Sequence, residues 1–160
     1  MKIVVVSDTH GNNKYILEKL LEMEKPDMLF HLGDYVEDGE KISSALGIET
    51  IIVKGNGDYF NTKYKEDELI NIKNKKIFLT HGHKYNVENG INNLYYKGLE
   101  LGADLVLFGH THKPIIEIEK NIIIMNPGSG SIPRSPDKIK TFGLVNIGEK
   151  INTKIIQINL

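Results

Sequence analysis

Near its start the chain carries the stretch IVVVSDTHG, residues 3–11, in which an apolar run passes directly into polar residues and a glycine. Four consecutive apolar β-branched residues predict a short strand that is buried on both faces. Asp8 and His10 follow this strand two positions apart, and such residues in an extended turn point to the same side. The stretch therefore predicts a buried strand that delivers a carboxylate and an imidazole to one place.

Five further runs rich in β-branched residues predict buried strands of the same kind. They lie at residues 28–32, 50–53, 76–79, 104–108 and 122–125. Three segments with a helical spacing of apolar residues separate several of these runs. They cover residues 13–24, 38–46 and 87–101, and Gly47 and Gly102 follow the last two as helix stops. This alternation of strands and helices predicts α/β layering with short right-handed crossovers.

The end of the sequence has a different pattern. Residues 140–147 and 151–159 are typical of strands and are joined by three residues that include Gly148, which predicts a hairpin instead of a crossover. We therefore expect two packed sheets with helices outside, in which the later strands are antiparallel. Because no linker, repeat or low-complexity stretch divides the sequence, residues 1–160 are expected to form a single domain.

Composition restricts both the partners and the kind of site. The 160 residues carry a formal net charge of −1, so no general affinity for nucleic acid or an anionic membrane is expected. Because the sequence contains no cysteine, any metal must be bound by oxygen and imidazole nitrogen. No run approaches the roughly 18 apolar residues of a membrane span, and the signal-peptide pattern is absent. A cytoplasmic enzyme is therefore expected.

Side chains with ligand chemistry follow the predicted strands, and the carboxyl ends of parallel strands meet at one edge of a sheet. The candidate metal ligands are Asp8, His10, Asp34, Asn56, His81, His110 and His112. Each motif alone is better explained as a hydrogen-bonded turn, but the recurrence of the whole set favours metal binding, with enough donors for two ions that share a carboxylate. Neighbouring glycines allow tight turns and close backbone approach. His31, inside an apolar run, is instead expected to be buried and hydrogen-bonded.

The series Asp-x-His, Gly-Asp, Gly-Asn-x-Asp, His-Gly-His and Gly-His-Thr-His, in this order, resembles the calcineurin-like metallophosphoesterase superfamily. The compact size and an Asn-Pro-Gly-Ser segment followed by Pro133 and Arg134 resemble its small bacterial and archaeal phosphodiesterase branch. The resemblance covers about residues 3–135 and implies the metallo-dependent phosphatase fold, a four-layer α/β/β/α sandwich of two mixed sheets flanked by helices.

The resemblance also implies how two divalent metal ions would be held. Asp8, His10 and His112 would bind the first ion. Asn56, His81 and His110 would bind the second, and the Asp34 carboxylate would bridge the two. Manganese is the first expectation for a site rich in imidazole and free of thiolate, with nickel, iron, cobalt or zinc as alternatives.

Two such cations lower the pKa of a bridging water until hydroxide exists near neutral pH, and this hydroxide attacks phosphorus in line. We therefore predict a metal-dependent phosphoric diester hydrolase that acts on a small phosphodiester and is weaker on monoesters. Asn56 is expected both to bind metal and to orient the reactants. Self-association into a homo-oligomer is left open.

One position departs from the family pattern. Many members have a histidine after the asparagine of the third motif, where it protonates the leaving group, but this sequence has Gly57. His83 is the nearest replacement as general acid, although a supporting or surface role explains it equally well. Asp58 is expected to orient a neighbouring group.

Two further residues are candidates for substrate binding. Arg134 can reach a substrate phosphate with its bidentate guanidinium, or form an ordinary salt bridge. Asn12 can contact substrate, or cap the following helix.

The alternative to an enzyme is a non-catalytic, metal-binding interaction scaffold of the same fold, as in a subunit of the retromer coat that also lacks the histidine of the third motif. The full ligand set favours catalysis, because a scaffold has no need of every ligand. A nuclease is less favoured, since the chain lacks the extra domains or extended basic surface of DNA-processing relatives.

Overall fold

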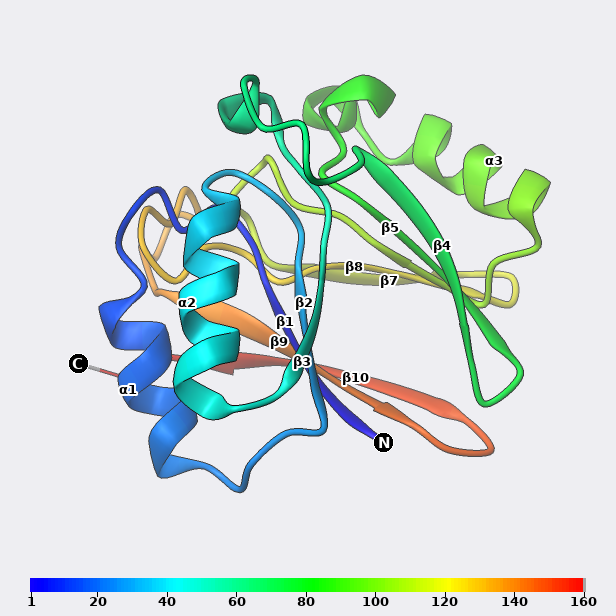
Figure 1. The fold of residues 1–160 in the computed structure, drawn as a ribbon. Coiled ribbons are helices and arrows are strands. Elements are labelled where there is room, and N and C mark those ends of the chain that lie inside the picture. The colour runs from blue at the N-terminus through cyan, green and yellow to red at the C-terminus, as the bar shows by residue number, and fades with distance from the viewer. Residues whose placement is uncertain (160) are drawn as a thin grey trace.

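The computed structural model describes residues 1–159, so the last position of the predicted domain lies outside it. Two five-stranded sheets pack face to face (Figure 1). The first sheet has the order β10 (Ile151–Gln157), β9 (Thr141–Ile147), β1 (Lys2–Val6), β2 (Met28–His31) and β3 (Glu49–Ile52). The second has the order β4 (Asp67–Ile72), β5 (Lys75–Thr80), β6 (Leu105–Leu107), β8 (Ile122–Asn126) and β7 (Ile115–Glu119).

The helices lie outside the two sheets. Helices α1 (Lys14–Glu22) and α2 (Val36–Leu46) cover the first sheet, and α3 (Asn92–Leu101) covers the second (Figure 1). Three short 3₁₀ turns complete the description: η1 (Asn56–Asp58), η2 (His83–Tyr85) and η3 (Val87–Asn89). No helix within residues 1–159 is both long enough and apolar enough to cross a bilayer. The predicted four-layer α/β/β/α sandwich is confirmed.

The apolar run of β1 is explained by burial on both of its faces. Ile3 and Val5 point into the core between the two sheets, whereas Val4 and Val6 pack under the helices of the first sheet. Side chains alternate across a strand, so a strand in an inner layer needs apolar residues at every position. This requirement produces the continuous runs that the sequence shows.

Strand directions bring the ligand-bearing loops together. Strands β1, β2 and β3 pair in parallel, as do β5, β6 and β8, so the loops after them leave from the same end of each sheet. Strand β9 pairs antiparallel with β1 and forms the predicted hairpin with β10. The carboxyl ends of both parallel sets meet at one edge of the sandwich (Figure 1).

Two strands were absent from the sequence prediction. Strands β4 and β7 are edge strands that pair antiparallel with β5 and β8. Charged and exposed residues interrupt both, and Ile118 of β7 is 69% exposed. An edge strand with one solvated face lacks the continuous apolar run that revealed the inner strands.

The predicted helices also needed correction. Residues 87–101 do not form one helix: η3 is followed by Gly90 at φ +128°, and α3 begins only at Asn92. A backbone with this φ cannot continue a right-handed helix. In α1, Ile16 and Leu20 fill the face against the sheet, and Leu21 is 62% exposed.

Candidate metal centre

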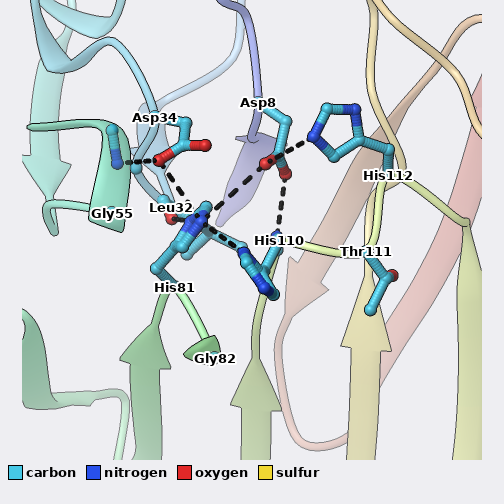
Figure 2. Close-up of polar contacts among 12 residues, drawn as sticks. Asp8, Leu32, Asp34, Gly55, His81, Gly82, His110, Thr111 and His112 are labelled. Atoms are coloured by element: carbon cyan, nitrogen blue, oxygen red, sulfur yellow. Dashed lines mark hydrogen bonds and ion pairs between the residues drawn. The ribbon is translucent and has the colours of Figure 1, made fainter. Parts of the chain in front are cut away.

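Six of the seven predicted ligands converge where the loops leave the parallel strands. They are Asp8, His10, Asp34, His81, His110 and His112. Figure 2 shows His81 and His110 rising from the ends of β5 and β6 toward the carboxylates of Asp34 and Asp8. The cluster is therefore assembled from loops of both sheets, at the edge where their parallel strands end.

One half of the cluster consists of Asp8, His10, Asp34 and His112. Each offers one ligand atom, and these four atoms all lie within 4.8 Å of one another. His112 Nε2 is 3.2 Å from Asp8 Oδ1 and 3.2 Å from His10 Nε2. Two carboxylates and two imidazoles at this spacing are a ligand set suited to a divalent transition metal.

The other half is built on His81 and His110. His81 Nε2 lies 3.3 Å from His110 Nδ1 and 3.4 Å from Asp34 Oδ1. The second oxygen of the same carboxylate, Asp34 Oδ2, lies 3.6 Å from His10 Nε2 in the first half. Asp34 therefore stands between the two halves, with one oxygen directed to each.

Backbone carbonyls fix the tautomers of two histidines. Nδ1 of His81 lies 2.7 Å from Leu32 O, and Nδ1 of His112 lies 2.6 Å from Ile132 O. Because a carbonyl oxygen only accepts, each Nδ1 must carry hydrogen and donate it. In the neutral ring Nε2 then presents a lone pair to the interior of the cluster. Metal-binding histidines in proteins are held in this way.

His110 presents its other ring nitrogen to the cluster. Its Nε2 lies 2.5 Å from the carboxylate of Glu88, so Nδ1 is the nitrogen that presents a lone pair inward. Asp8 Oδ1 is buried and has no hydrogen bond within residues 1–159. Lone pairs and a carboxylate oxygen that face one another in a buried site require a cation or a proton between them. The donor set fits divalent metal ions.

The ionisation of the cluster agrees with its role as a cation site. Burial acts to raise the pKa of Asp8, but His112 and His81 outweigh it and hold this pKa below its usual value. Burial acts to lower the pKa of His112, but Asp8 and the Ile132 carbonyl hold it above its usual value. The arrangement that stabilises a proton on His112 also stabilises a metal ion at the same position.

Five predicted ligands adopt a left-handed backbone. The φ angles are +56° at Asp8, +48° at His10, +56° at Asp34, +68° at His110 and +57° at His112. Each such non-glycine residue costs on the order of 1–2 kcal/mol. Strain of this kind persists only where surrounding contacts impose it, and it gathers at functional sites.

Buried polar side chains impose this backbone. Asp58 accepts hydrogen bonds from four backbone N–H groups in the loops that carry Asp34 and Gly55. Asp38 Oδ2 accepts from Gly11 N at 2.9 Å, beside His10. Ser129 Oγ donates to Asp8 O at 2.8 Å.

Two glycines are required by close approach to the carboxylates. A Cβ at Gly55 would lie 2.2 Å from Asp34 Oδ1, and a Cβ at Gly109 would lie 2.8 Å from Asp8 Oδ2. Any larger residue would displace the ligand oxygens, so the role predicted for these glycines beside the site is confirmed.

Asn56, the seventh predicted ligand, lies at the start of η1. This residue is exposed, and its side chain makes no hydrogen bond within residues 1–159. Its neighbour Gly57 reaches the cluster, because its N–H donates to Asp34 Oδ1 at 2.8 Å. The ligand role of Asn56 stays a prediction.

The remaining sequence candidates lie around the cluster. The half-buried ring of His83 is 5.5 Å from that of His81 between centroids, and burial lowers the pKa of His83. Asn12 is exposed and does not cap α1, because the N-cap residue is Asn13. Arg134 is exposed and lines a pocket beside the cluster.

His31 is buried, as predicted. Its Nδ1 accepts from Gly33 N at 3.3 Å, and its Nε2 lies 3.3 Å from Thr9 Oγ1. Both ring nitrogens are therefore satisfied inside the protein, and the residue supports the loops without joining the cluster.

Two supporting residues escaped the sequence analysis. Glu88, in η3, fixes His110 from a position 22 residues away in the chain, and an acidic residue inside a predicted helix carries no signal of such a role. Asp38 was assigned only to a helix. Its position in the first turn of α2 is favourable for any carboxylate, which concealed its bond to the ligand loop.

The family model for the calcineurin-like phosphoesterase superfamily domain matches residues 1–150. A protein of Methanocaldococcus jannaschii named a probable metallophosphoesterase is 35% identical, over 99% of this chain and 82% of the relative. A second protein of that archaeon, named a phosphodiesterase, is 32% identical over 80% of this chain and 83% of its own length.

Solved structures of other proteins share this fold. A predicted phosphoesterase from Streptococcus pneumoniae superposes with a TM-score of 0.80 at 29% identity, covering 98% of this chain and 88% of that one. Vps29 from Entamoeba histolytica, in complex with zinc, superposes with a TM-score of 0.78 at 22% identity, covering 99% of this chain and 100% of that one. The second similarity concerns the fold alone.

Proposed function

Because this chain belongs to the calcineurin-like phosphoesterase superfamily, we propose that it is a phosphodiesterase that works with two divalent metal ions. One observation carries the proposal: imidazole nitrogens approach Asp34 from two sides, and its two oxygens face different halves of the cluster. A bridging carboxylate between two sets of neutral donors is the arrangement that a pair of cations requires.

In this proposal Asp8, His10 and His112 hold the first ion, and His81, His110 and Asn56 hold the second. Asp34 bridges the two. Asn56 is the one proposed ligand with an exposed side chain, and it adjoins Gly57, which donates to Asp34. Manganese is proposed as the metal, with nickel, iron, cobalt and zinc also compatible with oxygen and imidazole donors.

When bound, the cations supply Lewis acidity, which lowers the pKa of water and neutralises charge on the phosphate oxygens. The chain supplies the rigidity of the site. Leu32 and Ile132 fix the orientation of the His81 and His112 rings, so that both Nε2 atoms stay directed inward without reorganising during the reaction. No side-chain nucleophile is needed for this chemistry.

A strong proton donor is missing beside the leaving group. Gly57 stands where many relatives have a histidine, and a general acid contributes roughly 10²–10⁴-fold to the rate. We assign the proton-donor role to His83, but burial lowers its pKa, so only a minor fraction is protonated at neutral pH. The enzyme should therefore prefer diesters with acidic leaving groups, which depart without protonation. Asn12 and Arg134 are proposed to contact the substrate.

Turnover of bis(p-nitrophenyl) phosphate by the manganese-loaded protein tests the proposal. We expect a higher kcat/KM for this diester than for p-nitrophenyl phosphate, and two metal ions per chain by elemental analysis. Asp34→Asn should abolish turnover and reduce the metal content. Asp137→Asn changes an exposed aspartate that, within residues 1–159, is bonded only to Ser135 and Ile139, and it should leave both unchanged. Normal metal binding with no diester turnover would refute the enzyme assignment.

A metal-binding interaction scaffold is the second candidate. Two observations favour it: the absence of an acid at Gly57, and a pair of exposed aromatic side chains two and three positions later, Tyr59 at 79% and Phe60 at 93%. The diester assay separates the two functions.

The enzyme proposal includes a small diester as substrate, a cytoplasmic location, and no general binding of nucleic acid or membranes. Sedimentation velocity would test for the homo-oligomer.

A further inference from the structure

A pocket of about 570 Å³ shares a wall with the metal cluster. Glu88, which holds His110, lines it, and so does Thr111, which stands between His110 and His112 in the chain. Arg134 lines it as well and is attached to the cluster through its backbone N–H, which donates to His112 O at 3.1 Å. A group bound in this pocket therefore lies beside the ligands of both halves.

The interior of the pocket is apolar. Phe108 and Val87 are buried at its base, and Ile91, Pro114 and Ile115 are half-buried around them. A volume in the range of roughly 300–1,000 Å³, with mainly hydrophobic walls and a few polar groups, is typical of small-molecule sites. A phosphate group alone gains no binding energy from apolar walls.

Charge at the rim is arranged for a phosphate with an uncharged substituent. Lys113 and Arg134 are exposed, and neither forms an ion pair in the part of the chain that the structure describes. Such cations attract a phosphate oxygen. Glu117, two positions beyond Ile115 on β7, also lines the pocket and disfavours a second anionic group. The preferred occupant is therefore apolar and uncharged.

We propose that this pocket binds one ester arm of the substrate, an uncharged aromatic group, while Lys113 and Arg134 hold the phosphate at its rim. The inference rests on the proposed phosphodiesterase function and specifies its substrate class. A phosphodiester with small alkyl groups leaves the apolar walls uncovered, whereas an aryl diester buries a ring on them. The pocket thus supplies a physical reason for a preference for aryl over alkyl diesters.

Binding of diphenyl phosphate to the zinc-loaded protein tests the pocket without relying on turnover. In methyl NMR spectra, the signals of Ile91 and Ile115 should shift with diphenyl phosphate and not with dimethyl phosphate. Because the apolar walls remove an aromatic ring from water, diphenyl phosphate should bind about tenfold more tightly than dimethyl phosphate, or more. Equal affinities for the two diesters, or shifts confined to residues outside the pocket, would overturn the proposal.

A variant in which a larger side chain fills the pocket provides a second test, with a matched control elsewhere on the surface. Ile91→Trp should weaken diphenyl phosphate by about tenfold while dimethyl phosphate binds as before. Ile118→Trp places the same side chain at an exposed position of β7 and should change neither affinity. Ile115→Thr makes the same wall shorter and polar, and it should weaken only the aryl ligand even if Ile91→Trp fails to fold. Wild-type affinity in both pocket variants would refute the assignment.

The outcomes separate this inference from the function on which it rests. Diphenyl phosphate bound at Ile91 and Ile115 by a protein without diester turnover would support the pocket and refute the phosphodiesterase. Diester turnover with unchanged aryl affinity in Ile91→Trp would support the phosphodiesterase and refute the pocket.

Discussion

The carboxylate of Asp58 holds together the two loops that carry Asp34 and Asn56, and its removal should destabilise both the fold and the metal centre. It accepts backbone hydrogen bonds from Asp34 at 2.8 Å, Tyr35 at 2.7 Å, Val36 at 3.1 Å and Gly55 at 2.8 Å. Two of these residues have a left-handed backbone, with φ of +56° at Asp34 and +74° at Tyr35. The bonds to Asp58 are therefore what maintains the Asp34 carboxylate in its position.

The magnitude follows from the number and burial of these bonds. A hydrogen bond to a charged group is worth about 1.5–3 kcal/mol, and a buried donor left without a partner costs about 1–3 kcal/mol. Contributions that share one carboxylate are not additive, and water can enter the gap left by alanine. We expect Asp58→Ala to lower the free energy of unfolding by about 3–5 kcal/mol, toward the upper end for single substitutions. For a domain of this size the melting temperature should fall by about 6–20 °C.

Urea denaturation of the metal-free protein, with the m-value held constant, measures this change, and isothermal titration with zinc measures the loss of metal binding. Asp58→Asn keeps one acceptor oxygen and should fall between wild type and Asp58→Ala. Asp137→Asn removes an exposed carboxylate with two local bonds and should cost less than about 1 kcal/mol. If Asp58→Ala stays within about 1 kcal/mol of wild type and binds zinc normally, the argument for Asp58 is wrong.

Three other predictions concern the support of the cluster and its surroundings. Glu88→Gln should weaken binding of the second metal ion by about 10- to 100-fold in zinc titrations, because the carboxylate fixes the ring of His110. Gly57→His should lower metal affinity in equilibrium dialysis instead of restoring an acid, since a Cβ there would lie 2.9 Å from Asp34 Oδ1. Burial lowers the pKa of His31 from 6.5 to about 4, so between these values the unfolded chain binds a proton that the folded chain does not. The contribution of His31 to the free energy of unfolding is then fully present above about pH 6.5 and should fall by up to about 3 kcal/mol as the pH drops to 4. Urea denaturation of the metal-free protein measures this change, and His31→Leu should give a flatter profile.

Matched controls test whether the first two results depend on the cluster itself. Glu100→Gln changes an exposed glutamate of α3 that, in the described part of the chain, pairs only with Lys97, and it should leave zinc affinity unchanged. Gly148→His inserts the same side chain where the nearest atom to a Cβ, Lys150 O, is 3.9 Å away, so metal affinity should equal that of wild type. A wild-type stability that does not change between pH 6.5 and 4 would contradict the assignment for His31.

Much of the fold could be predicted because its inner strands are marked locally. The run at residues 3–6 is apolar at every position because it is covered on both faces, and β6 and the run at residues 122–125 of β8 show the same pattern. Edge strands β4 and β7 were missed because their exposed faces mix charge with apolar residues. The third helix was drawn too long because Gly90 at φ +128° interrupts it, and a glycine alone does not reveal its φ in the sequence.

The sequence by itself determined which residue types gather at the candidate site, since aspartate or histidine beside glycine follows strands β1, β2, β5 and β6, and the alternation of strands and helices predicts that such strands run parallel. Tertiary structure alone decided the contacts between them. His110 N donates to Asp8 Oδ2 across 102 residues of chain, and Glu88 meets His110 across 22. Such pairs depend on sheet order and on how two sheets pack, which no local pattern encodes. The same packing decides which ring nitrogen of each histidine faces inward, because the carbonyl that fixes it belongs to another loop.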